Sequence, residues 1–294
     1  MLLATLYTLC LVMVSHLIGA GPASLGADTT ASTSTTVATT AAASVAPEAT
    51  PDRTGAVARP IRIAVLYDNR SLQPTLQSDW GFACLVSGPE KTVLFDTGSN
   101  PDILLSNMRA LSIDPQHVDA VVLSHAHQDH TGGLFAILAR KSDIGVFCPA
   151  SFSEGFTDRV REVGATLIPV RAASTICPGL TVTAPMGSSP EEIGLVIDSA
   201  EGPVLLTGCA HPGVATMAQT AATLGHGSLY AVLGGFHHSS RSAAEVSAII
   251  EDLKRLGVRR CGPAHCTGEA ATAQMSRAFG NGFIAMGVGA VVEF

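Results

Sequence analysis

Short apolar runs separated by turn residues begin at Ile61 and continue to the end of the chain. In the first half, valine, isoleucine and leucine dominate these runs, and turn residues bound them, as expected of strands. The runs predict strands at residues 61–68, 81–88, 92–98, 118–124, 144–149 and 165–170. Between them, apolar residues that recur every three or four positions predict helices at residues 101–113, 131–141 and 156–164.

The second half of the chain continues the mixture of strands and helices. Strands are predicted at residues 180–185, 193–199, 202–208, 228–235 and 258–264, with a final strand pair within 283–294. Residues 193–199 and 202–208 are expected to form a hairpin that turns at 200–202, and helices are expected at 211–225 and 243–257. Because both halves mix strands and helices, the pattern indicates an α/β (α+β) fold of two mixed sheets packed face to face, with helices outside.

The N-terminal residues have a different character. Residues 1–20 are apolar and lead into small residues at Ala20, Ala23 and Ala27, which predicts an export signal over residues 1–27. The alternative is an uncleaved membrane anchor, because the run approaches spanning length. Residues 28–60 lack aromatic residues and are rich in threonine, alanine and serine, which predicts a disordered linker before a domain at 61–294. The expected location is therefore periplasmic or extracellular, or at a membrane if the leader is retained.

Composition narrows the classes of partner. Hydrophobic residues make up 47% of the 294 residues and charged residues 14%, so the chain can bury a substantial core. The net charge is −7, and the 17 lysines and arginines form no basic stripe, which argues against nucleic acid and favours a small-molecule substrate. Seven cysteines are present, of which Cys10 lies in the leader; disulfides are permitted, but free buried thiols are equally compatible with the spacing.

The segment VVLSHAHQDHTGGL places three histidines and an aspartate where a buried strand ends. In an extended segment, alternate side chains point the same way, so His125 and His127 can reach one ion together. Asp129 and His130 follow the strand, where a turn can direct them to a second ion. A solvated polar loop is the alternative, but four such groups are costly to leave unpaired where they are buried.

The motif and its surroundings resemble the metallo-β-lactamase superfamily, whose signature is H-x-H-x-D-H after a strand. The resemblance spans residues 61–294, and one branch matches best, the metal-dependent hydrolases similar to an archaeal dihydropterin synthase. The matching stretches are LFDTG, DAVVLSHAHQDHTGGL, LLTGCAHPGV, LGGFH and PAHCTG. The resemblance implies a four-layer αββα sandwich and a centre of one or two divalent ions, preferably zinc, with iron or manganese as alternatives.

The same resemblance extends the site to later segments. It implies that Asp96 of LFDTG holds a ligand histidine through its second ring nitrogen. His211 and His265 are expected to be metal ligands, and Asp129 and His237 are expected to be catalytic, with metal ligation as an alternative for His237. Cys209 stands where the superfamily has a bridging aspartate, so either metal binding or a place in the pocket wall is expected for it. Cys266 is expected to pack, and His117, His226 and His238 are expected to be surface or loop residues.

These residues predict a hydrolase that uses metal-bound hydroxide on a small ester, lactone, amide or phosphoester. The alternatives are a dihydropterin synthase-like transferase that displaces pyrophosphate, a di-iron redox enzyme, and a non-catalytic metal-binding module. The D-T-G of LFDTG also occurs in pepsin-like proteases, which need a second aspartate loop. The nearest candidate, Asp198 in IDSAEG, lacks the third-position glycine. The substrate, the number of ions and the oligomeric state stay undetermined by the sequence.

Overall fold

The computed structural model describes residues 60–88, 90–224 and 227–294. The predicted export signal and all but the last residue of the predicted linker lie outside the described residues. Among the described helices, none is both long and apolar enough to cross a bilayer. The described residues therefore cover the predicted C-terminal domain, except for residues 89, 225 and 226, so the expectation for His226 lies outside them.

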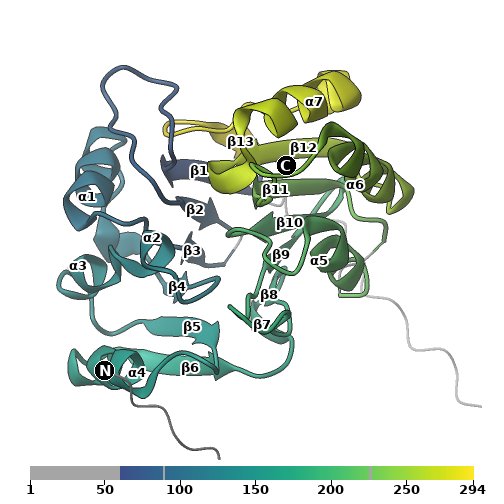
Figure 1. Ribbon diagram of the computed structural model, residues 1–294. Helices are drawn as coiled ribbons and strands as arrows, with labels where there is room; N and C mark the ends of the chain where they lie inside the picture. Colours follow the sequence, from purple (N-terminus) through teal and green to yellow (C-terminus); the bar gives the residue numbers. More distant parts are fainter. Residues whose placement is uncertain (1–59, 89, 225–226) are drawn as a thin grey trace, which may run out of the picture. The chain divides into compact units, whose positions relative to one another are not determined.

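Two mixed sheets form the centre of this domain (Figure 1). Among the described residues, the first sheet has seven strands in the order β13(Val291–Glu293), β1(Arg62–Tyr67), β2(Ala83–Ser87), β3(Thr92–Phe95), β4(Ala120–Val122), β5(Gly145–Pro149) and β6(Thr166–Val170). The second has six, in the order β12(Arg260–Ala264), β11(Ala231–Gly235), β10(Gly202–Thr207), β9(Leu195–Ser199), β8(Leu180–Val182) and β7(Ser174–Cys177).

Three apolar clusters hold four layers together. The central cluster joins the facing sides of the two sheets and contains Val65, Phe95 and Leu206, each fully buried. A second cluster covers the outer face of the first sheet with α1(Pro101–Ala110), α2(Gln128–Thr131), α3(Leu134–Leu138) and α4(Glu154–Glu162) nearby. A third does the same for the second sheet with α5(Val214–Ala221), α6(Ala243–Arg255) and α7(Glu269–Phe279). The predicted helix–sheet–sheet–helix sandwich is confirmed.

Parallel strands determine where a site can form. Strands β3, β4, β5 and β6 pair in parallel, and so do β10, β11 and β12. Because the carboxyl ends of parallel strands meet at one edge of a sheet, the loops that follow them converge there. Short 3₁₀ turns extend some of these connections, at η1(Pro115–His117), η2(His265–Thr267) and η3(Gly280–Gly282).

Most strand and helix predictions hold, but several need correction. Helix α7 was not predicted, and the helix predicted at 131–141 is shorter, because α3 covers only Leu134–Leu138. The hairpin is confirmed, since Ser199 of β9 pairs with Gly202 of β10. Strand β7 was not predicted, because its four residues carry too little apolar alternation to separate it from a loop. The predicted final strand pair was wrong: within 283–294 only β13 is a strand. Gly287 and Gly289, at φ 153° and 89°, adopt conformations that interrupt a second one. Helix α5 starts three residues later than predicted, at Val214.

Candidate metal centre

The predicted site residues gather at the carboxyl ends of strands from both sheets. In the first sheet, Asp96 follows β3 and His125–His130 follow β4. In the second sheet, Cys209–His211 follow β10, His237 follows β11 and His265 follows β12. At this edge Asp96, Ala210, His237 and His265 have φ between 47° and 55°, in the left-handed region that non-glycine residues seldom adopt. Backbone strain of this kind persists where surrounding contacts enforce it, and it is concentrated at functional sites.

A first triad consists of His125, His127 and His211. The Nε2 atom of His125 lies 3.1 Å from Nδ1 of His127 and 3.3 Å from Nε2 of His211. Burial, followed by the neighbouring His237 and His127, lowers the pKa of His211 to about 4. Burial and the adjacent imidazoles also lower the pKa of His125 strongly. The rings of His125 and His211 can therefore present neutral nitrogens, the form that binds metal ions.

A second triad consists of Asp129, His130 and His265. Oδ2 of Asp129 lies 3.7 Å from Nε2 of His130 and 3.3 Å from Nε2 of His265. Burial raises the pKa of Asp129, but the contacts with His265 and His130 outweigh it, so the pKa lies well below its usual range. The sequence placed Asp129 and His130 at a second ion, and the structure brings them together with His265, more than 130 positions along the chain.

Asp96 orients His130, one member of the second triad, from outside the group of ligand atoms. Its Oδ2 lies 2.7 Å from Nδ1 of His130, the ring nitrogen that faces away from the triad. Its Oδ1 and Oδ2 accept hydrogen bonds of 2.7 Å from the backbone and hydroxyl of Ser124. Burial lowers the pKa of His130, but the Asp96 carboxylate more than offsets this effect and raises it. Asp96 thereby fixes Nδ1 of His130 as the protonated nitrogen and leaves Nε2 for a metal.

Replacement of Asp96 by asparagine is expected to weaken zinc binding about 10- to 100-fold, the usual effect of losing an outer partner of a ligand histidine. The asparagine amide has one acceptor oxygen. It cannot accept hydrogen bonds both from Nδ1 of His130 and from the backbone N–H of Ser124, as the two oxygens of the buried carboxylate do. Competition with a chromogenic chelator measures the affinity. Asp119→Asn is the matched control, because Asp119 is exposed and, among the described residues, its carboxylate accepts a hydrogen bond only from the backbone N–H of Thr92, at the start of β3. Equal zinc affinities for the two variants would contradict this role of Asp96.

Asn69 plays the corresponding part for His265, and sequence reasoning did not identify it. Its Oδ1 lies 2.9 Å from Nδ1 of His265, and its Nδ2 donates to the His265 carbonyl at 3.1 Å. Nε2 of His265 is buried and has no hydrogen-bond partner among the described residues. The position of Asn69 just after β1, at the same sheet edge, was the signal that could have identified it.

Glu192 was also missed, and it shapes the loop that carries Cys209 and His211. Its side chain is fully buried. Oε1 accepts hydrogen bonds from the backbone of Gly208, Cys209 and Ala210 at 3.1, 2.9 and 2.8 Å, and Oε2 accepts one from His211 at 2.8 Å. Burial raises the pKa of Glu192, while these four donors stabilise the charged form. One carboxylate therefore fixes the backbone of the whole loop.

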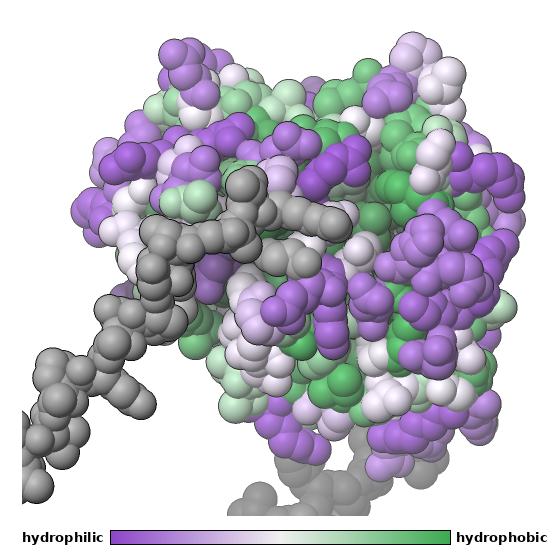
Figure 2. Space-filling model, turned by 180° about the vertical axis from the view of Figure 1, so that it is seen from behind, coloured by the Kyte–Doolittle hydropathy of each residue, from purple (hydrophilic) through white to green (hydrophobic). Residues whose placement is uncertain are grey.

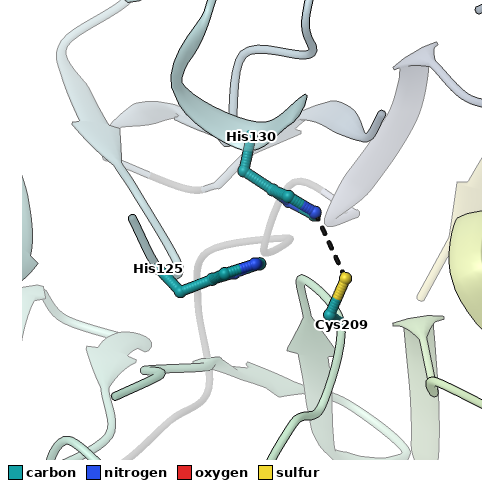
Figure 3. A group of neighbouring side chains, drawn as sticks. All are labelled: His125, His130 and Cys209. Atoms are coloured by element: carbon teal, nitrogen blue, oxygen red, sulfur yellow. Dashed lines mark hydrogen bonds between the residues drawn. The ribbon is translucent and has the colours of Figure 1, made fainter. Parts of the chain in front are cut away.

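Cys209 and His237 both lie beside the first triad, in one group of ligand atoms with His211. Sγ of Cys209 is 3.3 Å from Nε2 of His130, and Figure 3 shows His125, His130 and Cys209 pointing toward one another. The exposed ring of His237 lies 4.6 Å from the ring of His211, centroid to centroid. The hydrogen bond with Cys266 raises the pKa of His237, although burial opposes this shift. His237 is thus placed at the open side of the site.

The donor set fits divalent metal ions. Within each triad the ligand atoms lie within 4.8 Å of one another, as atoms that converge on one ion should. Asp96 and Asn69 hold the outer Nδ1 atoms of His130 and His265, and this leaves the Nε2 atoms of both rings directed toward Asp129. His125, His127 and His211 would hold one ion, and Asp129, His130 and His265 would hold the other. This arrangement also leaves Asp96 engaged with His130, which is incompatible with a protease aspartate.

His238 was predicted to be a surface or loop residue. It lies in the loop after β11, but not at the surface: it is only 2% exposed, and neither ring nitrogen has a hydrogen-bond partner among the described residues. Burial lowers its pKa to about 4, so the ring is neutral. Alternation along the chain after β11 turns His237 outward and His238 inward against Phe236, a distinction that two adjacent histidines do not reveal in sequence.

Comparisons with known proteins agree with this geometry. Residues 81–265 match the family model described as Metallo-beta-lactamase superfamily. A Methanocaldococcus jannaschii protein named 7,8-dihydropterin-6-methyl-4-(beta-D-ribofuranosyl)-aminobenzene-5'-phosphate synthase is 27% identical over 253 residues, covering 71% of this chain and 86% of that protein. The crystal structure of Tm1679, described as a metal-dependent hydrolase of the beta-lactamase superfamily, has a TM-score of 0.65 and 27% identity, covering 80% of this chain and 99% of its own. YhfI from Bacillus subtilis shares the fold, with a TM-score of 0.61 at 15% identity over 80% of this chain and 100% of its own.

Proposed function

Because the chain belongs to the metallo-beta-lactamase superfamily, as its motifs predicted, we propose that it is a metal-dependent hydrolase of a small ester, lactone, amide or phosphoester. The structural neighbour Tm1679, at 27% identity, is described as a metal-dependent hydrolase. A divalent ion in such a site lowers the pKa of bound water toward neutrality and polarises the bond to be cleaved.

The observation that carries this proposal is the convergence of two ligand triads from distant parts of the chain. His125 and His127 come from the end of β4 in one sheet, and His211 comes from the end of β10 in the other. The second triad likewise joins Asp129 and His130 to His265 after β12. Bringing five imidazoles and a carboxylate to one edge is costly unless they bind something in common.

The remaining polar groups have roles that follow from their positions. Asp129 is partly exposed, so its second oxygen can orient a water molecule or accept its proton. His237 is exposed beside His211 and can donate a proton to the leaving group. Asp96, Ser124 and Asn69 contact the Nδ1 atoms of His130, His125 and His265, respectively, and keep these rings in one tautomer and orientation.

We propose zinc as the preferred ion, with iron or manganese as alternatives, because imidazole and carboxylate ligands suit all three. A test uses the purified full chain, assayed by elemental analysis and with a panel of chromogenic esters, lactones and phosphodiesters. Chelation is expected to lower turnover of an accepted substrate at least about 100-fold. Re-addition of one metal should restore it. Retained metal without turnover on any member of the panel would instead indicate a binding module, and turnover insensitive to chelation would contradict a metal-dependent reaction.

A transferase that displaces pyrophosphate is the second candidate, favoured by the likeness to the protein of M. jannaschii that is named a synthase. We propose hydrolysis ahead of it, because export of the chain, expected from residues 1–27, would separate it from cytosolic substrates of that kind. Release of pyrophosphate only when a second substrate is present would favour the transferase. Product formation from one substrate and water would favour the hydrolase.

A further inference from the structure

The six cysteines of the described residues fall into two groups. Cys84, Cys148, Cys177 and Cys261 each belong to one of the three apolar core clusters. Cys209 and Cys266 belong to none of them, although they are only 3% and 4% exposed. Their surroundings are the ligand histidines of the metal centre. Packing in an apolar interior therefore accounts for the first group but not for the second.

Sγ of Cys209 is close to ligands of both triads. It forms one compact group of ligand atoms with His125 and His130 and another with His211 and His237. A third group joins it to His265 and Cys266. Because ligand atoms of the first and second triads both lie within 4.8 Å of this sulfur, it lies between the two triads. Figure 3 shows it facing His125 of the first triad and His130 of the second.

The surrounding structure holds the sulfur in this place. The backbone N–H of Cys209 donates to Glu192 at 2.9 Å, which fixes the residue at the start of its loop. Sγ of Cys266 lies 3.3 Å from Sγ of Cys209 and is positioned to donate a hydrogen bond to it. Gly235 leaves the necessary room, since a Cβ there would lie only 2.9 Å from Sγ of Cys266. Outer contacts of this kind orient a metal ligand and do not serve packing alone.

We propose that Cys209 is a thiolate ligand shared by both metal ions and that Cys266 is a positioning residue that stabilises this thiolate through its S–H group. The inference rests on the proposed metal centre and adds a soft donor to its nitrogen and oxygen ligands. Thiolate ligands favour zinc, and also cobalt and cadmium used as probes, over manganese. Imidazole and carboxylate ligands alone suit zinc, iron and manganese, and a thiolate at Cys209 therefore favours zinc over manganese.

Cobalt substitution of the full chain tests the assignment by absorption spectroscopy. Cobalt-loaded wild-type protein is expected to show a thiolate-to-cobalt charge-transfer band in the near ultraviolet. Cys209→Ser should lose the band and bind the second cobalt ion more weakly. Cys266→Ala should keep the band, with a shifted maximum, because the hydrogen bond to the bound thiolate is gone. Cys177→Ser, in the apolar core cluster between the sheets, is the matched control and should leave the band unchanged.

X-ray absorption of the zinc-loaded chain gives an independent readout, with a sulfur neighbour at about 2.3 Å expected for wild type and absent from Cys209→Ser. A band that persists in folded Cys209→Ser, or a loss of the band in folded Cys266→Ala, would overturn the corresponding assignment. Cobalt bound by wild type without any thiolate band would overturn the role of Cys209 while leaving the proposed hydrolase intact. Failure of the wild-type chain to bind zinc or cobalt would overturn both.

Discussion

His125→Ala is expected to remove at least one metal ion per chain and to lower turnover more than about 100-fold. This loss exceeds the usual effect of replacing a residue that only hydrogen-bonds to a metal ligand. His125 is the central member of the first triad: its Nε2 lies 3.1 Å from His127 and 3.3 Å from His211. His125 also forms a compact group of ligand atoms with Cys209 and with His130, a member of the second triad. Its Nδ1 contacts Oγ of Ser124 at 2.9 Å, which orients the ring so that Nε2 faces the other ligands.

The measurement combines elemental analysis with turnover of an accepted chromogenic substrate, and circular dichroism establishes that the variant is folded. His117→Ala is the matched control, because His117 is exposed at the end of η1 and belongs to neither triad. It should keep both metal content and activity. If folded His125→Ala bound metal and turned over substrate as well as His117→Ala, the first triad would not be a metal site.

Glu192→Gln is expected to lower the free energy of unfolding by about 3 kcal/mol and to weaken metal binding as well. The fully buried carboxylate accepts four backbone hydrogen bonds, from Gly208 through His211. An amide has one acceptor oxygen, and its NH₂ group would face a backbone donor, which leaves that donor unsatisfied in the interior. The loop would then no longer hold Cys209 and His211 against the centre.

Urea denaturation measures the stability change, and chelator competition measures zinc affinity. Glu191→Gln is the matched control: it makes the same chemical change one position earlier, where the side chain is partly exposed. Equal unfolding free energies for the two variants would show that the four hydrogen bonds contribute no net stability. A stability loss without a change in zinc affinity would show that the loop keeps its ligands in place without the carboxylate.

The local pattern of the chain determined most of the elements and four of the six triad ligands. Alternation and three-to-four spacing gave the strands and helices, because burial on one face of an element leaves a period in the sequence. His125, His127, Asp129 and His130 were identified for a related reason: six adjacent positions after a strand can reach a common point without knowledge of the rest of the fold. His211 and His265 were assigned only by their resemblance to family motifs.

Only the tertiary structure decided what depends on contacts between distant segments. Asn69 meets His265 across 196 positions, and Glu192 meets the loop of Cys209 from 17 positions earlier. The place of Cys209 between the triads, and the burial of His238 beside the exposed His237, also have no counterpart in the local sequence. The physical reason is that a period records which face of an element is buried, whereas the identity of the partner on that face is set when two sheets pack.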